Sequence, residues 1–330
     1  MNYSWHLARS AFVTSVVPSE GHGGGAAEYP NRPIRFIVPF AAGGPGDMLA
    51  RVLGEKLTES WGQPVTIEIK HGINGIVGSE IAAKAAPDGY TIVIAASAHY
   101  INPSIYRKLP FDPVNDFTAV SLVASGPNLI VLNPKVPLQS VRELIEYTKA
   151  HPGELKYGSG GFGSPSHLAG ELFNMMAGVK LVHVPYKGHA FAGVALSEGR
   201  ECQLMFDAAL TAMPHIKSGK WRAIAVTTAK RAGAFPDLPT IAEAGLPGYE
   251  VSPAMGVLAP AGTPPAIVHK LSREISRIVH LPGVMASLRR DGAEAVGNTP
   301  EEYAAYVKSE IAKWAKVVKN ANIEPLDTPQ

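Results

Sequence analysis

The stretch that most constrains this chain is Pro39–Arg51, Pro-Phe-Ala-Ala-Gly-Gly-Pro-Gly-Asp-Met-Leu-Ala-Arg. It follows the apolar run Ile34–Val38 and is continued by apolar residues at helical spacing, Leu49, Val52, Leu53 and Leu57. The pattern predicts a strand, a glycine loop and a helix. In an α/β fold, such a loop lies at the carboxyl edge of a sheet, where ligands bind.

Three glycines and an acid give this loop its chemistry. Gly43, Gly44 and Gly46 let the backbone come close to a ligand and adopt positive φ. Asp47 is placed as the helix N-cap. Free N–H groups at the start of a helix favour an anion. We therefore interpret this loop as a binding element for a small carboxylate.

From Tyr29 onward, apolar strands alternate with helical segments, which predicts an α/β fold with mostly parallel sheets. The layout recurs at 155–177, where a short strand, the loop Gly158–Gly163 and a helix follow one another. The chain is expected to cross between domains at Gly126-Pro127 and to return within Tyr249–Leu258. This divides it into 29–124 plus 252–330 and 125–251. Asn102-Pro103 and 109–113 are expected to form a turn-rich surface region.

Composition excludes several classes of protein. The 330 residues carry a net charge of +2 without a run of basic residues, which argues against a nucleic-acid partner. No run of 18 apolar residues is present, so nothing is expected to span a membrane. The single cysteine, Cys202, excludes an intramolecular disulfide and is interpreted as a packed thiol. Residues 1–28 are interpreted as a degenerate export leader or a disordered segment.

Motifs for catalysis, metals and cofactors are weak. Gly158–Gly163 satisfies G-x-G-x-x-G, but no acid closes the next strand, so a dinucleotide is not expected. No metal-ligand spacing occurs among the 11 histidines, and no nucleophile elbow is present. Two residues each have two possible roles. His167 is a packing or capping residue or a ligand contact, and Asp207 is a ligand contact or a cap for the segment that follows.

A dozen ordered motifs between Tyr29 and about Asn322 resemble the substrate-binding proteins of tripartite tricarboxylate transporters, the Bug family of periplasmic receptors. The motifs include Val38-Pro39-Phe40…Gly43-Gly44…Asp47, Ala86-Pro87-Asp88-Gly89-Tyr90-Thr91, Ser166-His167-Leu168-Ala169-Gly170-Glu171-Leu172, His183-Val184-Pro185-Tyr186-Lys187-Gly188 and Met205-Phe206-Asp207. This resemblance covers nearly the whole chain.

The resemblance implies a periplasmic-binding-protein-like fold of type II, in which two α/β lobes close on a ligand like a flytrap. It implies a monomeric, periplasmic protein that captures a small carboxylate (a dicarboxylate, tricarboxylate, acidic amino acid or aromatic acid) for delivery to membrane permease subunits. Neither a cofactor nor a metal is implied. The alternatives are a sensory receptor for the same ligands and, with Lys187 or a serine as nucleophile, an enzyme.

The ligand-binding residues implied by the resemblance lie on two loops and a wall between them. They are Phe40, Ala42, Gly43, Gly44 and Asp47 on the first loop, Gly161, Gly163, Ser164 and Ser166 on the second, and Ser97, Ala98, Asn102, Tyr186 and Asp207 on the wall. The chain departs from the family at Gly46, where Thr or Ser is frequent, and at His99 and Tyr100, which are bulkier than usual.

Overall fold

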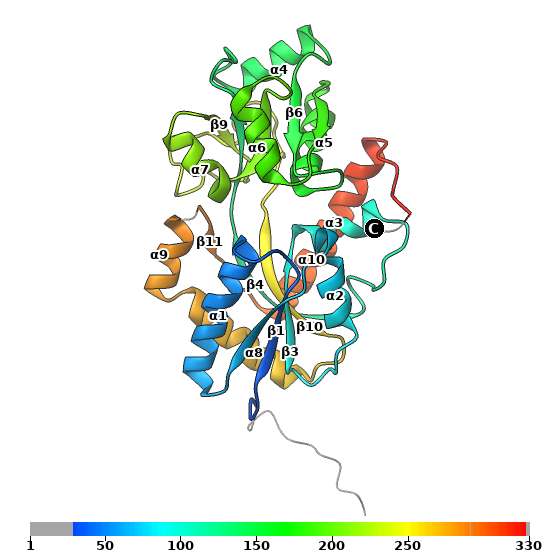
Figure 1. The fold of residues 1–330 in the computed structure, drawn as a ribbon, viewed down its shortest axis with the longest axis vertical. Coiled ribbons are helices and arrows are strands. Elements are labelled where there is room, and N and C mark those ends of the chain that lie inside the picture. The colour runs from blue at the N-terminus through cyan, green and yellow to red at the C-terminus, as the bar shows by residue number, and fades with distance from the viewer. Residues whose placement is uncertain (1–28, 291, 328–330) are drawn as a thin grey trace, which may run out of the picture.

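The computed structural model describes residues 29–290 and 292–327, which form two α/β lobes (Figure 1). The first lobe contains a six-stranded sheet in the order β11-β4-β10-β3-β1-β2. Its strands are β1 (Ile34–Val38), β2 (Val65–Ile69), β3 (Thr91–Ala96), β4 (Phe117–Ser125), β10 (Ala254–Pro260) and β11 (Glu294–Ala295). Its helices are α1 (Pro45–Trp61), η1 (Ile73–Gly75), α2 (Ile76–Ala83), α3 (Ser97–Ile105), α8 (Pro265–Val279), α9 (Pro282–Arg290) and α10 (Pro300–Asn320).

The second lobe contains a five-stranded sheet in the order β7-β6-β8-β5-β9. Its strands are β5 (Asn128–Leu132), β6 (Lys156–Ser159), β7 (Val182–Pro185), β8 (Leu204–Ala208) and β9 (Arg222–Val226). Its helices are α4 (Val141–Ala150), α5 (Pro165–Ala177), α6 (His189–Glu198) and α7 (Ala209–Lys217). The two-lobe α/β class expected from the sequence is thereby confirmed, while residues 1–28, interpreted as a leader, lie outside the described residues.

Both sheets are mixed, so the expectation of mostly parallel sheets was too strong. β1 pairs in parallel with β2 and β3, and β6 pairs in parallel with β7 and β8. β4, β5 and β10 make antiparallel pairs. The parallel pairs follow from helical crossovers, whereas β5 and β10 arrive from the other lobe without such a crossover.

Each sheet is buried on both faces by alternating side chains. In β1, Ile34, Phe36 and Val38 pack with α1 and α8, while Ile37 joins the core on the opposite face. That second core is continuous between the lobes, because Tyr100 of α3, Phe173 of α5 and Trp314 of α10 belong to it. The crossing segments also touch, since the Gly126 N–H donates to the Pro253 carbonyl at 3.0 Å.

Helix α10 begins as its sequence predicts. The Thr299 hydroxyl accepts from the Glu302 N–H, the Glu302 carboxylate accepts from the Thr299 N–H, and Pro300 takes the first helical position. Its buried stripe includes Tyr303 and Trp314. Within the described residues, no helix combines the length and the hydropathy needed to cross a membrane.

Helix α3 was not predicted, because Asn102-Pro103 was interpreted as a surface turn. Pro103 lies inside the helix, and Tyr100, Ile101 and Ile105 are completely buried. The Tyr100 hydroxyl hydrogen-bonds the Tyr303 hydroxyl of α10 at 2.8 Å. Tertiary packing against α10 therefore outweighs the local helix-breaking effect of proline.

The packing of α10 on β10 gives a first prediction. A methyl group at Gly256 would lie 2.3 Å from Tyr303 Cζ, in a fully buried region. Gly256→Ala is therefore expected to lower the free energy of unfolding by about 1–3 kcal/mol, because the tyrosine cannot move without disturbing the core. Urea unfolding followed by circular dichroism measures this difference.

The matched control is Gly283→Ala in α9, where an added methyl group meets nothing within 4 Å. We expect this change to leave the stability unchanged or to raise it by up to about 1 kcal/mol, because alanine favours the helix. Equal unfolding midpoints for the two variants would contradict the packing that we describe.

Candidate functional site

The predicted loops lie at the carboxyl ends of parallel strands in the two lobes (Figure 1). The first loop joins β1 to α1, and the second joins β6 to α5. The second loop lies against α3 of the first lobe, since a methyl group at Gly163 would lie 2.7 Å from Ile105 Cγ2. Gly163 has φ +72°, so both its conformation and its neighbour require glycine.

The first loop is held by Asp47, which does not take the N-cap position that we predicted. Gly44 is the N-cap and Pro45 takes the first helical position, so Asp47 falls in the first turn. Its buried carboxylate accepts from the Gly43 N–H at 2.8 Å and pairs with Arg51 at 2.8 Å. The carboxylate therefore fixes the loop, and its charge is balanced by Arg51.

The departure at Gly46 has a structural reason. A methyl group there would lie 2.9 Å from Phe40 Cδ2, and one at Gly75 would lie 3.1 Å from Phe40 Cε1. The half-buried Phe40 ring thus fits between two glycines, at the end of β1. The space that a hydroxyl-bearing side chain at position 46 would need is occupied by this ring.

The second loop is closed by hydrogen bonds within itself. The Ser159 hydroxyl accepts from the Gly161 N–H at 3.1 Å, and the Ser166 hydroxyl accepts from the Gly160 N–H at 3.2 Å. Ser164 caps α5 and donates to the Gly161 carbonyl at 2.7 Å. Two of the predicted contacts, Ser164 and Ser166, therefore lie side by side, with their hydroxyl oxygens 3.1 Å apart.

Two stacked histidines form hydrogen bonds to the residues of this loop. His167 accepts from the Gly163 N–H at 3.0 Å through Nδ1, and its ring stacks on His183 with centroids 3.8 Å apart. His183 in turn hydrogen-bonds the Ser159 hydroxyl at 2.6 Å. Burial lowers the pKa of His167 to about 3 and that of His183 to about 4, so both rings are neutral. Of the two interpretations of His167, the structure favours a packing and loop-fixing role.

Free amide donors remain on both loops. Within the described residues, no acceptor takes the N–H groups of Gly46 and Asp47 on the first helix or those of Phe162 and Ser166 on the second. Both helices begin with proline, Pro45 and Pro165, so the next amide is the first that a ligand meets. Such amides at the positive end of a helix are donors for a carboxylate.

The wall residues Ser97, Ala98 and Asn102 lie in α3, directly after β3. Asn102 donates to the Asn74 carbonyl at 3.1 Å, while its side-chain oxygen is buried without a partner among the described residues. Asn74, which we did not predict, has φ +48° and donates to the Tyr106 hydroxyl. An asparagine between Gly72 and Gly75 was the signal that could have identified this turn.

The bulky residues His99 and Tyr100 face the core rather than the loops. His99 donates from Nε2 to the Pro113 carbonyl at 3.0 Å, and its ring stacks on Phe111. Burial lowers its pKa to about 4, so this histidine is neutral. Both of these side chains are therefore part of the core.

The two wall residues of the second lobe are placed differently. The Tyr186 hydroxyl donates to Glu201, which precedes β8, while the Tyr186 backbone N–H donates to the Ser159 carbonyl beside the second loop. Tyr186 packs on Cys202, whose buried thiol has its pKa raised to about 11 by burial, as expected of a packed cysteine. Asp207, at the end of β8, is 1% exposed and accepts hydrogen bonds from His189 and Thr211.

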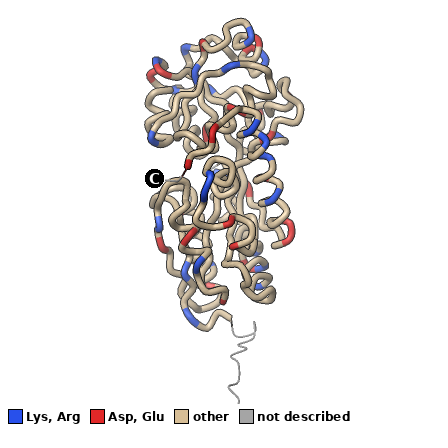
Figure 2. Tube along the Cα trace, turned by 90° about the vertical axis from the view of Figure 1, so that its right-hand side faces the viewer, with Lys and Arg blue, Asp and Glu red and all other residues tan. Residues whose placement is uncertain are grey.

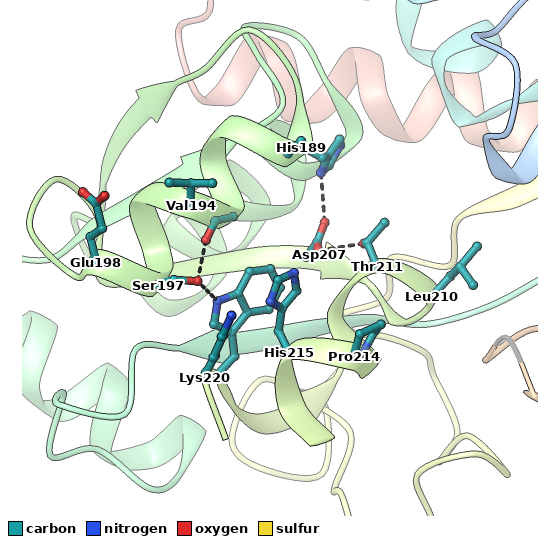
Figure 3. Close-up of a pocket in the computed structure, with 13 residues that line it drawn as sticks. His189, Val194, Ser197, Glu198, Asp207, Leu210, Thr211, Pro214, His215 and Lys220 are labelled. Atoms are coloured by element: carbon teal, nitrogen blue, oxygen red, sulfur yellow. Dashed lines mark hydrogen bonds and ion pairs between the residues drawn. The ribbon is translucent and has the colours of Figure 1, made fainter. Parts of the chain in front are cut away.

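A pocket of about 600 Å³ runs between α6 and α7 (Figure 3). His189, Asp207 and Thr211 lie together in this pocket, and His215 and Lys220 lie farther along it; Trp221, which also lines the pocket, stacks on His215. Lys187, considered as a nucleophile, is exposed outside this pocket. No group of three or more His, Cys, Asp or Glu side chains that could hold a metal occurs in the described residues.

Charged residues of both signs are interspersed over the two lobes (Figure 2). The two α/β lobes, each with a glycine loop before a helix, form the fold of a type II solute-binding protein. The chain belongs to the tripartite tricarboxylate transporter family of receptors, because residues 49–323 match the family described as "Tripartite tricarboxylate transporter family receptor". The resemblance identified from the sequence motifs is confirmed.

Relatives and solved structures agree with this assignment. BugT of Bordetella pertussis is 38% identical over 300 residues, spanning 89% of this chain and 90% of BugT. An R. palustris protein solved with adipate is 40% identical, with a TM-score of 0.80 over 90% of this chain and 100% of its own. MatC of Rhodopseudomonas palustris, solved with bound malate, is 34% identical, with a TM-score of 0.75 over 88% of this chain and 100% of its own. The chain is thus a solute-binding protein of the Bug family and not an enzyme.

The anchoring of the first loop gives a prediction on acid stability. The Gly43 N–H lowers the pKa of Asp47, burial raises it, and Arg51 lowers it again, with a net downward shift. The stabilisation by this carboxylate is therefore complete above the pKa of the unfolded chain and is lost as the pH falls through the lower folded pKa. Asp47→Asn is expected to weaken the fall in melting temperature between about pH 5 and about pH 2.

Melting temperatures of the parent protein and the variant across this range measure the effect. Glu55→Gln on the same helix is the control, because Glu55 is exposed and its ion pair within the described part of the chain is a long one, 3.6 Å from Lys56. Parallel curves for Asp47→Asn and the parent protein would show that Asp47 does not anchor the loop.

Proposed function

We propose that this protein captures a small carboxylate between its two lobes and delivers it to the membrane subunits of a tripartite transporter. The observation that carries the proposal is the pair of helix starts, one in each lobe, each with proline first and then amides without an acceptor among the described residues. A carboxylate bridging them replaces water on donors from both lobes, and so favours the closed arrangement. Such closure is a hinge motion about the crossing segments.

The two ligand-bound relatives support the choice of carboxylate. The R. palustris protein was solved with adipate and MatC with malate, and both are similar to this chain over most of its length. We infer that a dicarboxylate of this size is the ligand class here, held by backbone amides and serine hydroxyls. By analogy with the family, we place this activity in the periplasm, where the receptor meets its permease.

The proposed contacts comprise the two loops and part of the wall. They are Phe40, Ala42, Gly43, Gly44 and Asp47, then Gly161, Gly163, Ser164 and Ser166, and Ser97, Ala98, Asn102 and Asp207. Asp47 and Asp207 act by holding their neighbours, since both carboxylates are already hydrogen-bonded. Tyr186 joins the site only if its side chain turns away from Glu201.

A thermal-shift panel tests the proposal directly. Adipate, malate, succinate and citrate are compared with adipamide, which has the length of adipate without its charge. A ligand at about 100 times its dissociation constant is expected to raise stability by about 2.7 kcal/mol. A response to adipamide equal to that of adipate, or no response to any acid, would refute the proposal.

The role of the first loop is tested by Gly44→Val. The added carbon branches crowd the loop surface, where the only atom near a new Cβ is the Ala41 carbonyl oxygen at 3.3 Å. We expect affinity for adipate or malate to fall at least about tenfold, equivalent to about 1.4 kcal/mol, without unfolding. Titration calorimetry measures the affinity, and Gly283→Val, far from both loops, should bind as the parent does. Unchanged affinity in Gly44→Val would remove this loop from the site.

A further inference from the structure

His189, the first residue of α6, lies directly against the second loop. A methyl group at Gly160 would be 2.7 Å from His189 Cδ2 and 2.8 Å from Nε2, so the ring edge that carries Nε2 abuts this glycine. The side chain is 43% exposed. Gly160 is therefore needed for the imidazole to sit beside the loop, and nothing in the sequence motifs indicated this histidine.

A buried carboxylate orients the ring. His189 Nδ1 donates to Asp207 Oδ1 at 2.9 Å, and the other Asp207 oxygen accepts from the Thr211 hydroxyl at 2.7 Å (Figure 3). Since Nδ1 is committed to Asp207, the second nitrogen, Nε2, has no partner among the described residues. The arrangement fixes the imidazole and leaves Nε2 available beside the loop.

The surroundings favour the protonated ring. Burial lowers the pKa of His189, but the hydrogen bond and the charge of Asp207 raise it, with a net upward shift. Asp207 is the acid on the neighbouring strand, and Lys187 is the exposed cation two residues before. Among the described residues, the pocket has three other titratable groups. Glu198 is the last residue of α6, His215 lies near the end of α7, and Lys220 follows α7. His167 and His183, behind the loop, are neutral.

We propose that His189 is a ligand-binding residue, whose Nε2–H donates to a carboxylate of the solute held at the second loop, with Asp207 as its positioning residue. This rests on the function proposed above and extends it. The amides of the loops recognise an anion at any pH, whereas the imidazolium adds a charge that strengthens binding only while it is protonated. The ligand class is accordingly a dianion rather than a neutral or singly charged solute.

The consequence for binding has a definite sign. Affinity is highest below the pKa of His189 and falls as the pH rises through it, because the ring then loses the proton that pairs with the ligand. A hydrogen bond to a charged group supports a change of about tenfold or more between the two limits. If His189 served only to balance the charge of Asp207, pH would alter stability without altering affinity.

The experiment is calorimetric titration of adipate and malate into the full chain at several values between about pH 5 and about pH 9. The parent protein is expected to lose about tenfold or more in affinity across this range. His189→Gln, which retains a neutral donor, should bind at all pH values with the weaker affinity of the parent at high pH. His215→Gln, at the far end of the same pocket, should keep the parent's profile.

Melting temperatures measured at each pH separate folding from binding. If His189→Gln does not fold, Gly160→Ala serves instead, because its methyl group forces the imidazole off the loop while leaving His189 in place. If the variant that removes or displaces the ring keeps the pH-dependent affinity, the proposed role of His189 is wrong, while the proposed function stands. Absence of binding by the parent at every pH overturns the proposed function, and this inference with it.

Discussion

The close approach of Gly163 to Ile105 fixes the second loop of one lobe against helix α3 of the other. At this point the second loop of one lobe rests on α3 of the other, with room for a hydrogen atom but not for a methyl group. The continuous core through α3, α5 and α10 lies behind this contact and joins the lobes on that side. Both loops follow the carboxyl ends of strands, where we propose that a small solute meets amides from the two lobes.

Both lobes pair a buried aspartate with a cationic side chain. Each lobe places a buried aspartate near its loop, and each aspartate has a cationic neighbour on a helix: Arg51 in α1 for Asp47, and His189 at the start of α6 for Asp207. Arg51 is permanently charged and is paired with Asp47. His189 retains a free nitrogen and titrates, so the two lobes contribute differently to an anion. Recognition therefore combines backbone amides with a single titratable charge.

Much of the fold could be predicted from the sequence. The capping box at Thr299 and the apolar run of β3 are local patterns, and the structure has both. The ordered motifs identified the family and both glycine loops. The predictions that were wrong concern contacts between distant segments. Helix α3 forms despite Pro103 because Tyr100 packs on Tyr303. The sheets are mixed because β5 and β10 cross between the lobes. His189 could not be selected, because its partner Asp207 is eighteen residues away on a strand.

By itself, the sequence determined the alternation of strands and helices and the two glycine loops, since these depend on backbone preferences within a few residues. Only the tertiary structure decided which loop amides remain free, because neighbours such as Asp47 and Ser166 consume some of them. It also decided that Gly46 accommodates the Phe40 ring and that Gly160 accommodates His189. These contacts depend on distances between separate segments of the chain, and such distances cannot be read from the local sequence.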